Sequence, residues 1–256
     1  PRLAEQSLDG LHHRIFFDEK LVSELRLYCQ SNGVTPSMVL LGVYGILVGR
    51  YANQKDFCIG MPIANRNHPQ IELLIGFFVN ILAIRCDLSD DPRFDEFIQS
   101  VKQTCLEAYE HEDLPFEKLV DELGIERSLS HNPLFQVAFS FQKTSNSLDS
   151  HGLGLEFEFA IEEPFSSKFD ITLAISEDGD QIYGDIEYAT VLFSTDTIAR
   201  FGQHYLSLLK ACLKSSHKQV SSIPFLTDSE LCQIKDMALE SVDYSLETIP
   251  GMFAEM

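Results

Sequence analysis

The spacing of apolar residues changes once along this chain, from a helical period to a strand period. In the first half, apolar residues return every three to four positions over several stretches, which is typical of helices that bury one face. From Phe135 onward, apolar and polar residues alternate, which is typical of strands with one buried face. The predicted helices cover residues 18–29, 35–52, 94–109, 115–124 and 195–213, and the predicted strands cover residues 11–17, 57–63, 75–85, 135–141, 155–161, 169–175 and 181–188.

Capping and turn residues support these boundaries. Asp18 is expected to cap the first helix, and Thr35 followed by Pro36 is a typical start for the second. That second helix is apolar nearly all round, which predicts a central position in the core. The pair Asp178-Gly179 predicts a tight hairpin into the last strand. The order of elements indicates an α/β fold with a mixed sheet, flanking helices and a late antiparallel meander.

Composition narrows the class of partner. The chain has 256 residues, of which 45% are hydrophobic, so it can bury a full core. A formal net charge of -20 and a pI of about 4.6 argue against nucleic acid and against an anionic membrane surface, because both require a basic face. The six cysteines form no CxxC pair, so we expect free thiols in a reducing cytoplasm. The apolar run 38–49 is too short to span a bilayer.

Common catalytic signatures do not occur. The sequence has no GxSxG elbow, P-loop, HExxH or dinucleotide fingerprint. The cluster His111, Glu112 and Asp113 is the best candidate for metal binding. A simpler interpretation is the end of one helix followed by the cap of the next, with Asp113 accepting backbone N–H groups near Pro115. We therefore expect no metal site and no directly bound cofactor.

The run of residues 75–85, IGFFVNILAIR, is the most informative stretch. A buried strand does not need Asn80, and burying an amide without partners costs about a few kcal/mol. Asn80 is therefore expected either to have a firm hydrogen-bonding role or to face a wet channel.

Four blocks together resemble the C-terminal lobe of a condensation domain from a nonribosomal peptide synthetase. Residues 60–66 (GMPIANR) are similar to the family's GxPxxxR loop, and residues 75–85 to its (I/V)GxFVNTxxxR block, with Ile81 in place of threonine. Residues 111–117 (HEDLPFE) are similar to its (H/N)QDxPFE block, with Glu112 in place of glutamine. Residues 127–135 (RSLSHNPLF) are similar to its RDxSRNPLF block, with Ser128 and His131 as departures.

The resemblance implies a fold and a reaction. The fold would be that of chloramphenicol acetyltransferase, in which two lobes form a V around a tunnel. The reaction would be amide formation, in which an amine on one carrier protein's phosphopantetheine arm attacks a thioester on another. Residues 1–217 would form the C-terminal lobe, and residues 218–256 would lead toward an adenylation domain. The partners would be the N-terminal lobe, carrier proteins and that adenylation domain.

The resemblance places the family's catalytic HHxxxDG motif in the N-terminal lobe. In this chain, residues 12–18 (HHRIFFD) begin with paired histidines, but the aspartate falls one residue late and Glu19 replaces the glycine. We therefore interpret His12 and His13 as structural or surface residues. The chain begins at a proline in a polar stretch, and we expect it to be part of something longer. Alone, it is expected to be inactive.

The resemblance also implies roles for individual residues. Asn80, Arg85 and Arg66 would line the substrate tunnel, with Asn80 touching a pantetheine arm or the reacting amide, or else pinning two strands. Arg66 would otherwise be an exposed arginine paired with Glu72. The segment 143–154 would cross between the lobes. The residues expected to hold the motifs in shape are Gly76, Phe78, Asp113, Pro115, Phe116, Arg127, Asn132 and Pro133.

Two other hypotheses stay open at this point. In the first hypothesis, the chain is a non-catalytic module that docks carrier proteins or completes another chain. Alternatively, it would be a self-sufficient acyltransferase with His111 or His131 as its base.

Overall fold

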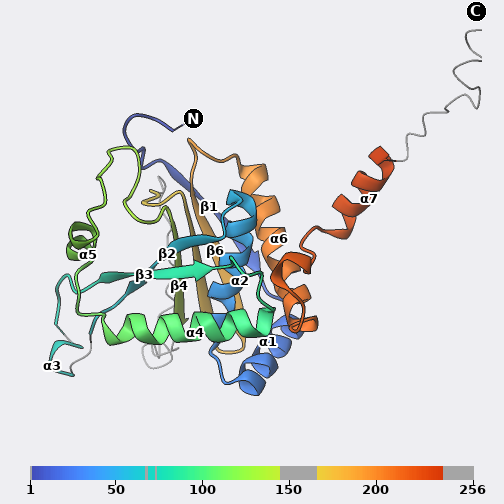
Figure 1. Cartoon of the computed structure of the whole chain (residues 1–256), viewed down its shortest axis with the longest axis horizontal. Helices are drawn as coiled ribbons and strands as arrows, with labels where there is room; N and C mark the ends of the chain where they lie inside the picture. The colour runs from blue at the N-terminus through green and yellow to red at the C-terminus, as the bar shows by residue number, and fades with distance from the viewer. Residues whose placement is uncertain (1, 67–68, 73, 145–165, 239–256) are drawn as a thin grey trace, which may run out of the picture. The chain divides into compact units, whose positions relative to one another are not determined.

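A computed structural model describes residues 2–66, 69–72, 74–144 and 166–238 (Figure 1). Among these residues, a mixed sheet of six strands has the order β1-β6-β5-β4-β2-β3. The strands are β1 (Gly10–Phe16), β2 (Asp56–Ile63), β3 (Asn80–Asp87), β4 (Val137–Thr144), β5 (Ile171–Asp178) and β6 (Gln181–Ala189). The helices are α1 (Glu19–Asn32), α2 (Pro36–Ala52), α3 (Pro69–Glu72), α4 (Phe94–Glu110), α5 (Phe116–Glu122), α6 (Thr195–Lys214), the short 3-10 helix η2 (Val220–Ser222) and α7 (Asp228–Ala238).

The strands pair in both senses. β1 with β6, β6 with β5, and β2 with β3 are antiparallel, whereas β4 is parallel to both β5 and β2. The β2–β4 ladder contains a single pair, Gly60 with Ala138, while the β4–β5 ladder runs from Val137 to Thr144. The sheet is therefore weakly joined between β2 and β4.

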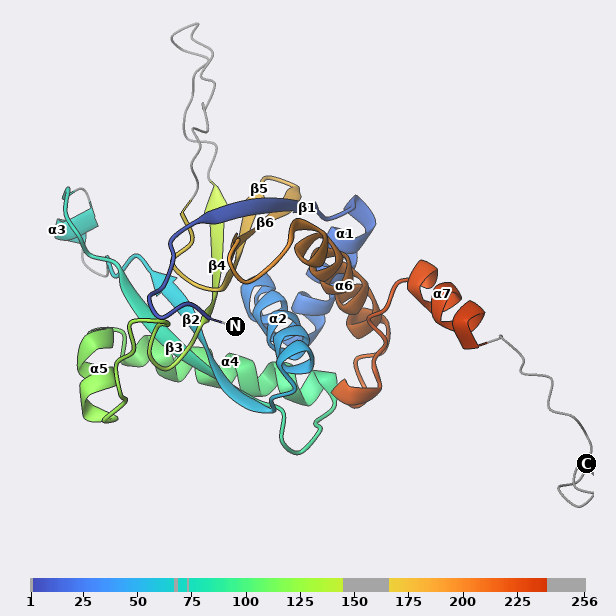
Figure 2. The same cartoon turned by 90° about the horizontal axis from the view of Figure 1, so that it is seen from above.

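Four helices cover one face of the sheet. α2 packs against α4, α6, β2 and β4, α4 packs against β3, and α1 and α6 pack against β6 (Figure 2). α2 is buried from Met38 to Gly49, which confirms its predicted central position. Its glycines allow close approach: a Cβ on Gly42 would overlap Ile98 Cδ1, and one on Gly45 would lie 2.9 Å from Cys86 Sγ.

Local signals predicted these elements well. Asp18 accepts a hydrogen bond from Leu21 N at 2.8 Å and caps α1. Thr35 accepts one from Met38 N at 3.3 Å and caps α2, with Pro36 as its first residue. The hairpin between β5 and β6 has Gly179 at φ +57°, as the predicted turn requires.

Two predictions need comment. The predicted strand 75–85 is wrong at its start, because β3 begins only at Asn80. Ile75 and Phe77 are 104% and 94% exposed, so the apolar run does not continue into the sheet. The predicted strand 155–161 lies outside the described residues, and so does nearly all of the predicted crossing segment 143–154.

The chain divides into two compact units, Pro1–Phe225 and Leu226–Met256. Residues up to Phe225 belong to the first unit, where Arg50 donates to the carbonyl oxygens of Val220 and Ile223 and stacks on the Phe225 ring. Asp91 accepts two further hydrogen bonds from Ser221. The assignment of 218–256 as a linker to an adenylation domain stays a prediction.

Within the part of the chain that the structure describes, no single helix is long and apolar enough to cross a membrane. The bent pair α1 and α2, with 105° between the two helices, meets the length and composition test only when counted together.

Candidate functional site

The GxPxxxR-like loop and the RxxSxNPLF-like block meet at Gly60 and Phe135. Gly60 is on β2, and Phe135 lies two residues before the start of β4 and is 2% exposed. A Cβ on Gly60 would overlap the Phe135 ring and lie only 2.6 Å from its Cζ, which is closer than any side chain tolerates. Only glycine at position 60 leaves room for this ring.

Phe135 is the middle ring of an aromatic row. Its centroid is 5.2 Å from that of Phe116 and 5.7 Å from that of Phe169. Phe116 is the first residue of α5 and belongs to the HEDLPFE block. Spacings of this size are favourable for aromatic pairs. The third motif block is therefore fixed to the fourth through ring contacts.

Asn80 joins the remaining block, residues 75–85, to the HEDLPFE block. Its Nδ2 group donates to the carbonyl oxygens of Glu112 and Leu114, both at 2.8 Å. Its Oδ1 atom accepts from Ile81 N at 2.9 Å and from Phe116 N at 3.2 Å. A carboxamide has two donors and two acceptor positions, and all are used here.

These bonds resolve the two expectations for Asn80. It has a firm hydrogen-bonding role, and it pins the first residue of β3 to the turn between α4 and α5 rather than pinning two strands. All four sequence blocks thus converge on one cluster, which we call the motif junction: Gly60, Asn80, Phe116 and Phe135. A contact between Asn80 and a pantetheine arm stays a prediction.

Arg66 organises the loop before β3. Its guanidinium donates to the carbonyl oxygens of Ile71 at 2.6 Å and Leu74 at 2.8 Å, and its Cζ lies 4.5 Å from the centroid of the Phe78 ring. A Cβ on Gly76 would lie 2.9 Å from the same ring. Gly76 and Arg66 both lie against the Phe78 ring, while Ile75 and Phe77 are exposed; a structural role for Gly76 and Phe78 stays a prediction.

Arg85 lies on the edge strand β3, on the solvent side. It forms a bidentate ion pair with Asp56 of β2, with nitrogen–oxygen distances of 2.8 and 2.7 Å. The hydrogen bonds and charge of Asp56 raise the pKa of the Arg85 guanidinium. In turn, the hydrogen bonds and charge of Arg85 lower the pKa of Asp56. A place for Arg85 in a substrate tunnel stays a prediction.

The other predicted structural residues lie around the α5 segment. Asp113 is not the cap of α5: the N-cap residue is Pro115, which cannot supply a side-chain hydrogen bond. The N–H group expected to need a cap, that of Phe116, is bound by Asn80 instead. Arg127 pairs with Asp121 at 2.8 Å, and Asn132 donates to the carbonyl oxygen of Lys168 at 2.8 Å.

Pro133 completes this last block as a turn. Its carbonyl oxygen accepts from Phe135 N at 2.8 Å, and the intervening Leu134 has φ +68°. This tight turn, unusual for leucine, directs the Phe135 ring toward β2.

The four histidines considered as catalytic candidates, His12, His13, His111 and His131, lie on different segments of the described chain. His111 is the exposed C-cap residue that follows α4, and His131 Nδ1 lies 2.8 Å from Ser130 Oγ. His12 and His13 are on β1, the edge strand opposite β3 in the sheet. In the described parts of the chain, no group of three or more His, Cys, Asp or Glu side chains could hold a metal ion.

The buried thiols are not activated as nucleophiles. Burial raises the pKa of Cys29 and Cys105 to about 11 and that of Cys212 to about 12. A reactive cysteine needs the opposite shift, because the thiolate is the nucleophile. These side chains act as small apolar core residues.

Sequence comparison assigns most of the chain to one family. The family model described as "Condensation domain" matches residues 1–234. Gramicidin S synthase 2 from Brevibacillus brevis is 36% identical over 100% of this chain and 6% of its own length. Phosphinothricin tripeptide synthetase PhsC from Streptomyces viridochromogenes is 36% identical over 93% of this chain and 22% of its own length. The chain thus spans a small part of these relatives.

Solved structures share the fold. The X-domain from teicoplanin biosynthesis, in complex with OxyB, has a TM-score of 0.80 and 26% identity over 89% of this chain and 50% of its own. A four-domain nonribosomal peptide synthetase bound to AMP and glycine has a TM-score of 0.82 and 21% identity, over 100% of this chain and 20% of its own. The expected chloramphenicol acetyltransferase-like α/β fold is confirmed by these neighbours.

Proposed function

We propose, since this chain belongs to the condensation-domain family, that it is one lobe of a unit that joins carrier-bound amino acids through amide bonds. The motif junction carries this proposal, because it brings all four resembling blocks into one contiguous cluster. Relatives that are named as synthases of gramicidin S, tyrocidine and bacitracin point to the same chemistry.

The proposed reaction is a simple acyl transfer. The amine nitrogen of the acceptor bonds to the thioester carbonyl carbon of the donor, and the carbon–sulfur bond breaks. The donor thiol leaves with a proton that began on the amine. Both reactants would be held on phosphopantetheine arms of carrier proteins in the cytoplasm.

This lobe would position the reactants rather than move the proton. The HHxxxDG motif does not occur in the sequence, and His12 and His13 lie on an edge strand away from the motif junction. By resemblance, the histidine comes from the N-terminal lobe. We therefore propose that residues 1–217 need that lobe for condensation, and that residues 218–256 lead to an adenylation domain.

Asn80 would contribute by fixing the position of the α4–α5 turn relative to the start of β3. With its four hydrogen-bonding positions used, a pantetheine arm could reach Asn80 only by displacing one of them. The family-motif asparagine is therefore proposed as a positioning residue, and Arg66 as the residue that shapes the neighbouring loop.

Reconstitution tests the proposal. The chain is co-expressed with an N-terminal condensation lobe that carries HHxxxDG, and dipeptide formation from two aminoacyl-loaded carrier proteins is followed by mass spectrometry. Product is expected from the pair and not from either lobe alone. Product from the isolated chain that disappears in His111→Ala or His131→Ala would instead establish a self-sufficient acyltransferase.

A binding module without condensation is the second candidate. It is favoured by the likeness to the X-domain, which is described in complex with OxyB. The two candidates separate in the same assay: a lobe that binds carrier protein in pull-down experiments but gives no dipeptide with an active partner lobe is a docking module.

A further inference from the structure

A cavity of about 410 Å³ lies between the ends of α2 and α6 and the sheet, and it contains none of the residues of the predicted tunnel. It begins where the β2–β4 ladder stops. Only Gly60 and Ala138 pair in that ladder, so the preceding residues Cys58 and Gln136 separate and line the cavity. Its volume is within the range of small-molecule sites.

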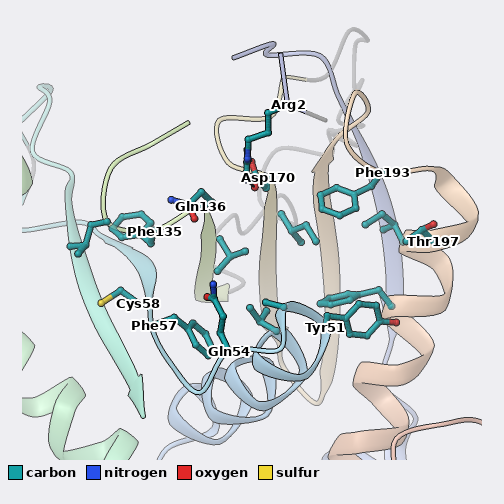
Figure 3. Close-up of a pocket in the computed structure, with 17 residues that line it drawn as sticks. Arg2, Tyr51, Gln54, Phe57, Cys58, Phe135, Gln136, Asp170, Phe193 and Thr197 are labelled. Atoms are coloured by element: carbon teal, nitrogen blue, oxygen red, sulfur yellow. Dashed lines mark hydrogen bonds and ion pairs between the residues drawn. The ribbon is translucent and has the colours of Figure 1, made fainter. Parts of the chain in front are cut away.

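The wall of the cavity is largely apolar. Figure 3 shows Tyr51, Gln54 and Phe57 along one side, with Phe193 and Thr197 contributed from the region of α6. The remaining apolar lining comes from Val48, Ala52, Leu134, Phe135, Val137, Ile171, Ile198 and Phe201. Such a lining favours a ligand with a bulky aromatic or branched group.

The charges in the cavity cancel each other. Arg2 forms a bidentate ion pair with Asp170, one of whose distances is 2.9 Å (Figure 3). The side chain of Asp170 is 13% exposed, so this carboxylate is largely enclosed with its partner. The hydrogen bond with Asp170 raises the pKa of Arg2, so the guanidinium stays charged. A charged ligand would find no counter-charge here, and its desolvation would be uncompensated.

The neutral polar groups suit an amide. Gln136 donates from Nε2 to the carbonyl oxygen of Asn132 at 3.0 Å, which fixes its carboxamide at the wall. Among the residues that the structure describes, the Gln54 side chain forms no hydrogen bond, so its carboxamide is available to a ligand. A carboxamide pairs with a peptide group through one donor and one acceptor.

We propose that this cavity binds a neutral, peptide-like small molecule: an uncharged amide that carries one aromatic or branched apolar side chain. The site shares the Phe135 ring with the motif junction but contains neither Gly60, Asn80 nor Phe116, and it does not depend on condensation chemistry. Binding can therefore fail while condensation succeeds, and the reverse.

N-acetyl-L-phenylalanine methylamide is a suitable probe, measured by isothermal titration calorimetry on the full chain. At a typical efficiency for small ligands, we expect a Kd of roughly 0.1–1 mM. N-acetyl-L-phenylalanine, which is anionic at pH 7, is expected to bind at least about fivefold more weakly, because burying its charge is not compensated.

Gln54→Trp tests the location, because Gln54 is an exposed residue that lines the cavity and an indole there would occupy it. At least a tenfold loss of affinity for the probe is expected. Gln203→Trp is the matched control, because Gln203 is exposed on α6 and lies outside the cavity lining. The affinity of this variant for the neutral probe should equal that of the unmodified chain. Thermal melts of both variants establish that they fold.

Arg2→Ala tests the charge argument. Without Arg2, Asp170 becomes an unpaired carboxylate at the wall, so the cationic probe L-phenylalanine methylamide should gain at least fivefold in affinity. The proposal is overturned if the neutral probe shows no binding at 5 mM, or if Gln54→Trp binds it as well as Gln203→Trp does. If Arg2→Ala leaves the ratio of affinities for the neutral and cationic probes unchanged, the assignment of a neutral ligand is overturned.

Discussion

Removal of the Asn80 side chain is the sharpest test of the motif junction. Asn80→Ala takes away four hydrogen bonds at once, three of which are partly buried and one exposed. A partly buried hydrogen bond contributes roughly 1 kcal/mol net, and water replaces an exposed one at little cost. The expected loss in the free energy of unfolding is therefore about 3 kcal/mol.

Urea denaturation measures this loss. The chain has no tryptophan, so far-UV circular dichroism is the appropriate signal. With an m value of ~3 kcal/mol/M, the midpoint should fall by about 1 M. Asn132→Ala is the matched control, because its side chain makes one exposed hydrogen bond, to the carbonyl oxygen of Lys168, and should shift the midpoint by less than ~0.3 M.

A second variant separates the two halves of the amide. Asn80→Asp keeps oxygen acceptors for Ile81 N and Phe116 N but places a carboxylate against the carbonyl oxygens of Glu112 and Leu114. It should be at least as unstable as Asn80→Ala at pH 7. Amide hydrogen exchange should rise first in residues 111–117. Equal midpoints for Asn80→Ala and Asn132→Ala would refute the role assigned to Asn80.

Three further predictions concern the surroundings of this site. Gly60→Ala should destabilise the chain by about 1–3 kcal/mol, because its Cβ would overlap the Phe135 ring, and adding Phe135→Leu should recover part of that loss in the same urea assay. Arg50→Met should raise amide hydrogen exchange in residues 219–225, measured by mass spectrometry, without changing exchange in α5; unchanged protection there would contradict the anchoring role of Arg50. The hydrogen bonds from Ser221 lower the pKa of Asp91, so their contribution is present above an unfolded-state pKa of about 4 and is lost as the pH falls through the lower folded value. Asp91→Asn should therefore be less stable than the unmodified chain at pH 7 but lose less stability between pH 5 and pH 2, as followed by thermal melts.

The sequence by itself determined most helices and their ends. Asp18 and Thr35 cap α1 and α2 through hydrogen bonds to residues only three positions away, so the relevant chemistry is contained in a short stretch. The hairpin at Gly179 is similarly local. The motif blocks also identified the family, because residue types at fixed spacing are visible without coordinates.

The tertiary structure decided how those blocks act. An apolar run predicted a strand from residue 75, but Ile75 and Phe77 are exposed, and Arg66 binds the backbone of the preceding residues Ile71 and Leu74 in a loop. The carbonyl partners of Asn80 could not be predicted either, since Glu112 and Leu114 lie more than 30 positions later in the chain. Hydrogen bonds and ring contacts between distant segments depend on strand order and register. A periodic pattern specifies which face of a strand is buried, but not which segment covers it.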